Sequence, residues 1–87
     1  MTNIIEQITL ANENGLPLEL LKAITNEPSI DNAIYSFVEM VEKSGLSVEQ
    51  TALDEAIEKG LVLDGEEIHP NANGYYWVEI LNEWIKF

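Results

Sequence analysis

The hydrophobic pattern predicts four amphipathic helices over the first two thirds of the chain. The first places its apolar side chains on one side at helical spacing: Ile4, Ile5, Ile8 and Ala11. Asn3 and Glu6 form a capping box ahead of it, and Asn14-Gly15 supplies a left-handed stop. Pro17 suits the first turn of a second, short and apolar helix, and Pro28 lies just beyond its end.

The third and fourth helices carry the clearest boundary signals. Ser29 caps the third, which ends at Ser44-Gly45. Its apolar stripe leaves the acidic side chains Asp31, Glu39 and Glu42 on the opposite side. Ser47 to Gln50 forms a second capping box, and Lys59-Gly60 ends the helix that it opens. In that fourth helix we expect three acidic side chains to face solvent: Asp54, Glu55 and Glu58.

The joint Ser44-Gly45-Leu46-Ser47 between these helices resembles the turn of a helix-turn-helix motif. In a DNA-binding motif of this kind, the second helix enters the major groove. Here the exposed side of that helix is acidic, and its flanks hold no basic cluster to meet phosphates. The joint is therefore interpreted as an antiparallel helix hairpin.

The last stretch, residues 74–87, holds five of the seven aromatic residues of the chain. At 100° per residue it forms two adjacent apolar stripes: Tyr76, Ile80, Trp84 and Phe87 in one, and Trp77, Leu81 and Ile85 in the other. This arc is wider than a surface helix needs. The pattern predicts a fifth helix that is either central to the core or has aromatic surface to spare for a partner.

Residues 61–70 do not follow a helical pattern. Asp64-Gly65 is a strong two-residue turn signal, which allows a small hairpin joining Val62 to Glu67. The predicted fold is therefore all-α: residues 1–87 form a single helical domain. It is a compact bundle of about five short helices with a small irregular or β-hairpin corner near residues 61–70.

Charge narrows the classes of partner. The 87 residues include 16 acids and four lysines, so the net charge is −12, and there is no cysteine. Such a surface repels nucleic acid and anionic membranes, whose binding depends on basic side chains, and it is attracted to basic proteins. Disulfides and thiolate metal sites are excluded. No apolar run is long enough to span a membrane, and the N-terminus lacks the basic start of a signal peptide, so we expect a cytoplasmic protein.

The segment from His69-Pro70 to Gly74-Tyr75 resembles the last conserved block of the SGNH (GDSL-type) esterases. The resemblance implies that His69 is a general base, with Glu66 in place of the orienting aspartate. The Gly-Asp-Ser nucleophile block and the oxyanion-hole blocks of that family are absent from the chain. Because a histidine and an acid make no triad without a nucleophile, we expect no enzymatic activity.

A metal site at His69 with neighbouring acids is the other chemistry that this segment suggests. Zinc requires more nitrogen or sulfur ligands than the chain has, and the acids lack the spacing of a calcium loop. We interpret the acids as a solvated turn and expect no metal or cofactor.

The acids between Glu39 and Glu67 have two interpretations: a solubilising surface, or negative charge presented to a basic cleft in imitation of nucleic acid. The excess of acids over lysines favours the second, because a solubilising surface more usually mixes both signs. The candidate acidic binding residues are Glu39, Glu42, Asp54, Glu55, Glu58, Asp64, Glu66 and Glu67. The candidate aromatic anchors are Tyr75, Tyr76, Trp77 and Trp84.

Two further resemblances bear on the type of partner. Size, acidity and the all-helical pattern are similar to the immunity proteins of nuclease colicins, although Trp77 follows Tyr75-Tyr76 where those proteins have proline. The run from Met40 to Thr51 is similar to phage late-transcription coactivators, which are small acidic adaptors on RNA polymerase that end in a hydrophobic tail. Both resemblances imply an acidic protein that binds another protein.

The sequence thus predicts a non-enzymatic inhibitor or adaptor, of bacterial or phage type, that occupies a basic surface on a target protein. The alternative is a homo-oligomerising structural or small-molecule-binding module, in which the aromatic C-terminal helix pairs with its copy in a homodimer. Trp77 is the residue to inspect. Burial against Leu61, Val62 or Ile68 would make it core, and exposure would make it an anchor.

Overall fold

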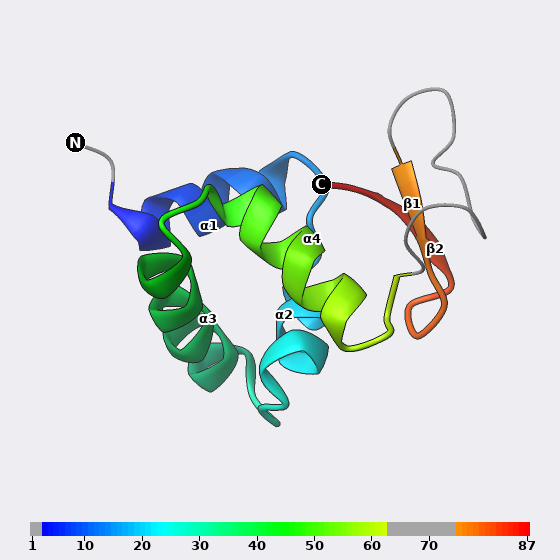
Figure 1. Cartoon of the computed structure of the whole chain (residues 1–87), viewed down its shortest axis with the longest axis horizontal. Helices are drawn as coiled ribbons and strands as arrows, with labels where there is room; N and C mark the ends of the chain where they lie inside the picture. Colours follow the sequence, from blue (N-terminus) through cyan, green and yellow to red (C-terminus); the bar gives the residue numbers. More distant parts are fainter. Residues whose placement is uncertain (1–2, 63–74) are drawn as a thin grey trace.

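Four helices followed by a two-stranded antiparallel hairpin make up the part of the chain that the structure, a computed structural model, describes: residues 3–62 and 75–87. The helices are α1 (Ile4–Glu13), α2 (Leu18–Thr25), α3 (Ile30–Ser44) and α4 (Val48–Glu58). The strands are β1 (Tyr75–Val78) and β2 (Glu83–Lys86). The hairpin lies at one end of the helical arrangement, and β2 leads the C-terminus back toward α1 and α4 (Figure 1).

The four predicted helices are confirmed, and local hydrogen bonds explain where they begin. The side chains of Asn3, Ser29 and Ser47 each accept a hydrogen bond from the backbone N–H three residues later. In the second capping box, the Gln50 side chain also extends along the helix, and its Nε2 donates to Asp54 Oδ1 at 2.9 Å. At the C-terminal ends of α2 and α3, Asn26 and Gly45 adopt the left-handed conformation, with φ of 58° and 69°.

The core lies where α2 and α3 pack together, with α1 and α4 in contact with both the core and α3. Phe37 of α3 and three side chains of α2 are fully buried in it: Leu20, Leu21 and Ile24. Helix α4 presents Val48, Ala52 and Ala56 to this core. The small alanines allow its backbone to approach closely. Thr51, the one buried polar residue recorded within residues 3–62 and 75–87, is satisfied by Ser44 Oγ at 2.9 Å.

The predicted C-terminal helix is wrong. Residues 75–78 and 83–86 pair as antiparallel strands in the register Tyr75↔Lys86, Tyr76↔Ile85, Trp77↔Trp84 and Val78↔Glu83. The tight turn between them contains Asn82 with a φ of 54°, and the Asn82 N–H donates to the Glu79 carbonyl at 3.0 Å. Aromatic and β-branched residues favour strands, and these eight positions are rich in them. The fold is therefore mostly helical with a β-hairpin, and not all-α.

The corner predicted near residues 61–70 falls mainly outside the described residues, which include only Leu61 and Val62 of it. Val62 is buried, and the N–H groups of Leu61 and Val62 both donate to the Ala56 carbonyl, which closes the end of α4. No helix among residues 3–62 and 75–87 combines the length and the apolar content that crossing a bilayer requires.

Candidate protein-binding surfaces

Helix α3 presents an acidic face that surrounds an exposed tyrosine. Glu39 and Glu42 are exposed, as the sequence predicts. Asp31 and Tyr35 share their side of the helix, since residues three or four apart lie on one face. Tyr35 is 65% exposed. It was not among the predicted anchors, although its position opposite the apolar stripe, between two acids, marked it as a surface aromatic.

Helix α4 divides its predicted acids between two environments. Asp54 and Glu58 are exposed and follow Gln50 along one stripe of the helix. Glu55 is half-buried and lies on the same side as Thr51, one turn earlier. Asp54 and Glu58 are therefore exposed to a partner, with Asp54 Oδ1 also accepting a hydrogen bond from Gln50, whereas Glu55 is only partly exposed.

Little of this negative charge is neutralised within the protein. The described residues contain 13 acids, which are the 16 of the chain less Asp64, Glu66 and Glu67, together with all four lysines. Among them there is one ion pair, Lys22 Nζ to Glu19 at 3.3 Å. Within the described residues, the exposed carboxylates of α3 and α4 accordingly form no ion pair.

The predicted sites in the acidic turn have no counterpart in the described structure. Asp64, Glu66, Glu67 and His69 all lie outside the described residues. Within residues 3–62 and 75–87, no group of three or more His, Cys, Asp or Glu side chains is arranged to hold a metal ion.

The hairpin has one face toward the core and one face away from it. Because directly paired residues share a face, Tyr76, Val78, Glu83 and Ile85 lie on one side. Val78 and Ile85 are buried there, and Tyr76 packs edge-to-face against Phe87 with ring centroids 5.8 Å apart. Tyr76, a predicted anchor, is thus packed against the hydrophobic core.

The opposite side, here called the aromatic face, consists of Tyr75, Trp77, Trp84 and Lys86. The rings of Trp77 and Trp84 form an edge-to-face pair, with centroids 5.5 Å apart and planes at 64°. Trp84 is 46% exposed and Trp77 is half-buried, and neither belongs to the core cluster. Three of the four predicted anchors therefore lie on this face, but on a strand pair in place of the predicted helix.

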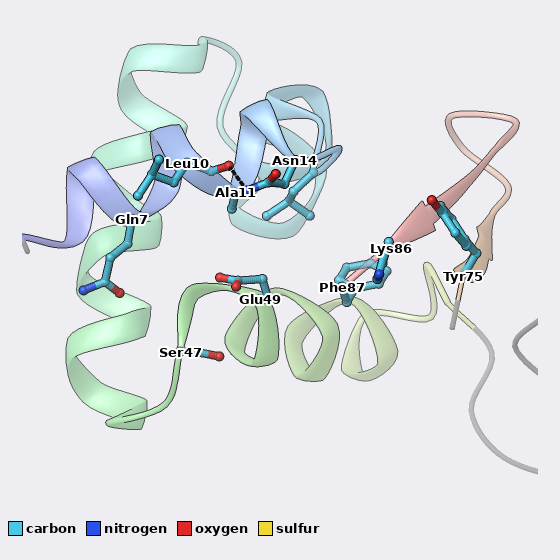
Figure 2. Close-up of a pocket in the computed structure, with 10 residues that line it drawn as sticks. Gln7, Leu10, Ala11, Asn14, Ser47, Glu49, Tyr75, Lys86 and Phe87 are labelled. Atoms are coloured by element: carbon cyan, nitrogen blue, oxygen red, sulfur yellow. Dashed lines mark hydrogen bonds between the residues drawn. The ribbon is translucent and has the colours of Figure 1, made fainter. Parts of the chain in front are cut away.

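A groove of about 630 Å³ lies between α1, the start of α4 and the end of the hairpin. Figure 2 shows the α1 side chains along one side, Ser47 and Glu49 along another, and the hairpin residues closing one end. Its lining residues are Gln7, Leu10, Ala11, Asn14, Leu16, Ser47, Glu49, Tyr75, Lys86 and Phe87. Sequence reasoning missed this groove, because its three walls are far apart along the chain.

Comparisons of the chain with protein-family models, with curated proteins and with solved structures give no significant match. The resemblances noted in the sequence are therefore local, and no match to a whole family supports them. The hairpin also departs from the all-helical pattern that contributed to the likeness with immunity proteins. A functional assignment has to rest on the surfaces of this chain.

Proposed function

We propose that this protein is a non-enzymatic, acidic protein-binding domain: an inhibitor or adaptor that occupies a basic, nucleic-acid-binding surface of a target protein. The observation that carries the proposal is the unpaired charge. Thirteen acids in the described structure share four lysines and form a single ion pair. A surface of this kind accelerates association with a positively charged partner.

The exposed acids of α3 and α4 supply long-range attraction in this proposal, and exposed aromatic residues supply the short-range contacts. Trp84 of the aromatic face and Tyr35 of α3 are the most exposed of the described tyrosines and tryptophans. Tryptophan and tyrosine are enriched among the residues that dominate interface energies. We therefore assign steering to Glu39, Glu42, Asp54 and Glu58, and anchoring to Trp84 and Tyr35.

The test is affinity capture from the source cell with three baits: the wild type, Asp54→Asn/Glu58→Gln, and Trp84→Ala. The partner is the protein that the wild type retains and that both variants retain less. Its association rate should fall steeply between low and physiological salt for the wild type, and less steeply for the charge variant, because salt screens exposed charges. Salt-independent association for both would contradict the steering role.

Nucleic acid should compete with the wild type for the captured partner, because both would occupy the same basic surface. A partner that binds nucleic acid and this protein simultaneously would contradict the imitation of nucleic acid while leaving the adaptor role intact.

The alternative hypothesis, a homo-oligomer, depended on pairing of the predicted aromatic helix, and residues 75–87 form a β-hairpin in place of that helix. Self-association through the aromatic face would bring together two chains that each carry a net charge of −12. Like-charge repulsion of this size opposes association. We expect a monomer in light scattering coupled to size-exclusion chromatography, at low and at high salt.

A further inference from the structure

The exposed face of α3 places an aromatic ring between carboxylates. Asp31 precedes Tyr35 by four residues and Glu39 follows it by four, so each lies on the same face, about 6 Å away along the helix axis. Glu42 lies two turns beyond Tyr35 on that face. The three acids are exposed, and Tyr35 is 65% exposed. Helix geometry therefore puts a carboxylate one turn away on either side of the ring.

The orientation of this face is fixed by the opposite side of α3, which is held in the core. Three apolar side chains are buried there: Ala33, Phe37 and Val41. Within residues 3–62 and 75–87, Tyr35 takes part in neither of the two ring pairs. Glu39 forms no ion pair in this part of the chain, although Lys43 follows it by four residues. The α3 face is thus open to a partner.

The aromatic face of the hairpin does not combine a ring with acids in this way. Trp84 shares that face with Lys86, two residues along the same strand. A lysine ammonium group disfavours a second cation nearby, because like charges repel. Helix α3 and the hairpin lie on opposite sides of the molecule (Figure 1). Tyr35 is therefore the better of the two exposed rings for receiving a cationic side chain.

We propose that the α3 face binds an arginine side chain of the basic partner, with the guanidinium group stacked on the Tyr35 ring and hydrogen-bonded to the carboxylate of Asp31 or Glu39. This inference rests on the proposed function, because it names the side chain through which the basic surface is recognised. A guanidinium group is planar and weakly hydrated, so it stacks on a ring while its N–H groups pair with a carboxylate. A lysine ammonium group is a compact, strongly hydrated charge and gains less from the same ring.

An arginine in this position is what a nucleic-acid-binding surface offers. Surfaces that bind single strands use cationic side chains to follow the backbone, and their arginines add cation–π contacts with the bases. In the proposed complex, Tyr35 takes the place of a base and the flanking carboxylates take the place of phosphates. The same arginine therefore serves nucleic acid and this protein in turn.

The experiment is an NMR titration of the full chain with two capped peptides of equal charge, hexa-arginine and hexa-lysine. Both should bind at low salt, because the protein is strongly acidic. Hexa-arginine should bind about two- to fivefold more tightly, the ratio that corresponds to one exposed cation–π contact. Saturable shifts with hexa-arginine should include the ring signals of Tyr35 and the amides of α3.

Variants of the ring separate stacking from general attraction between opposite charges. Tyr35→Leu keeps an exposed apolar side chain but removes the ring, so the dissociation constants of the two peptides should become nearly equal. Tyr35→Phe should preserve their ratio, because the ring remains. Trp84→Leu is the matched control on the hairpin and should also preserve the ratio.

Variants of the flanking acids test the second contact. Asp31→Asn/Glu39→Gln should weaken the binding of hexa-arginine by about two- to fivefold, the effect of losing an exposed ion pair. Glu6→Gln/Glu13→Gln removes the same charge from exposed positions of α1, with Glu6 in the first turn as Asp31 is in α3. This control should weaken binding less, because α1 carries no exposed ring beside its acids.

Three results would overturn the inference: equal binding of hexa-arginine and hexa-lysine, an unchanged ratio in Tyr35→Leu, or a ratio that is lost in Trp84→Leu. None of them affects the salt-dependent capture of a basic protein, which tests the proposed function. Failure to capture a basic protein would in turn contradict the proposed function and leave the measured ratio as it is. The two failures are therefore distinguishable.

Discussion

The helical body (residues 3–62) and the C-terminal hairpin (residues 75–87) hold their structure in different ways. Each helix of the body has its own cap or left-handed stop and contributes buried side chains to a shared core. The hairpin has one buried face, built around Val78 and Ile85, and a short turn. A two-stranded sheet alone is marginal in water. We therefore expect the hairpin to require the body in order to stay folded, whereas the helices of the body should stay folded without the hairpin.

Spectroscopy can follow the two regions separately. Both tryptophans, Trp77 and Trp84, are in the hairpin, and the described helices lie entirely in the body. Tryptophan fluorescence therefore reports the hairpin, whereas far-UV circular dichroism reports mainly the helices. The following variants are expected to change the two signals together when they affect the body, and the fluorescence signal first when they affect the hairpin.

The largest effect is expected in the body. Phe37→Ala should reduce the free energy of unfolding by about 3–5 kcal/mol, because it removes a fully buried ring from the centre of the core. Both signals should shift together in urea, since the hairpin loses its support when the body unfolds. Tyr35→Ala, two residues away on the exposed face, is the control and should change stability by no more than about 0.5 kcal/mol. Equal losses from the two variants would contradict the orientation of α3.

The second effect tests the hairpin against the helix that the sequence pattern suggests. Ile85→Ala should cost about 2–3 kcal/mol, the lower part of the range for buried isoleucine, because Ile85 is buried at the edge of the molecule. Ile80→Ala should cost little, since Ile80 lies in the turn and is 63% exposed. In the C-terminal helix that the sequence pattern predicts, Ile80 and Ile85 would both lie on apolar stripes. Comparable losses measured by tryptophan fluorescence would therefore favour the helix.

The smallest effect concerns the turn. Asn82→Val should destabilise the hairpin by about 1–2 kcal/mol, because a β-branched residue is strained at a φ of 54°. Asn82→Gly, which tolerates that angle, should be neutral or slightly stabilising. In a helix the order would be reversed, since glycine is the poorer helix former. The fluorescence midpoint in urea distinguishes the two orders.

The helices were predictable because their signals are local. A cap such as Ser29 or Ser47 accepts a hydrogen bond from a backbone N–H three residues away, so it can be recognised from a few consecutive residues. The exposed positions of Glu39, Glu42, Asp54 and Glu58 follow from the same spacing. Glu55 was placed less well, because its partial burial depends on the side of α4 that carries Thr51, and only packing decides that.

The binding surfaces were predictable in residue type but not in arrangement. The sequence pointed to Tyr75, Trp77 and Trp84, and the strand register brings these three together on one face. It also pointed to Tyr76, which the same register places toward the core. The groove had no sequence signal, because Leu10, Glu49 and Lys86 come to line one groove only when α1, α4 and the hairpin are assembled.

The sequence by itself determined four helices, their boundaries and a strongly acidic surface. These follow from hydrogen bonds and spacings within about one helical turn and from a count of charges. The tertiary structure alone decided the conformation of residues 75–87. Their apolar residues fit a helical stripe through Tyr76, Ile80 and Trp84, and they also fit the alternation of two strands. The choice between these patterns depends on whether Val78 and Ile85 find a core to cover, and that core is supplied by residues distant in the chain.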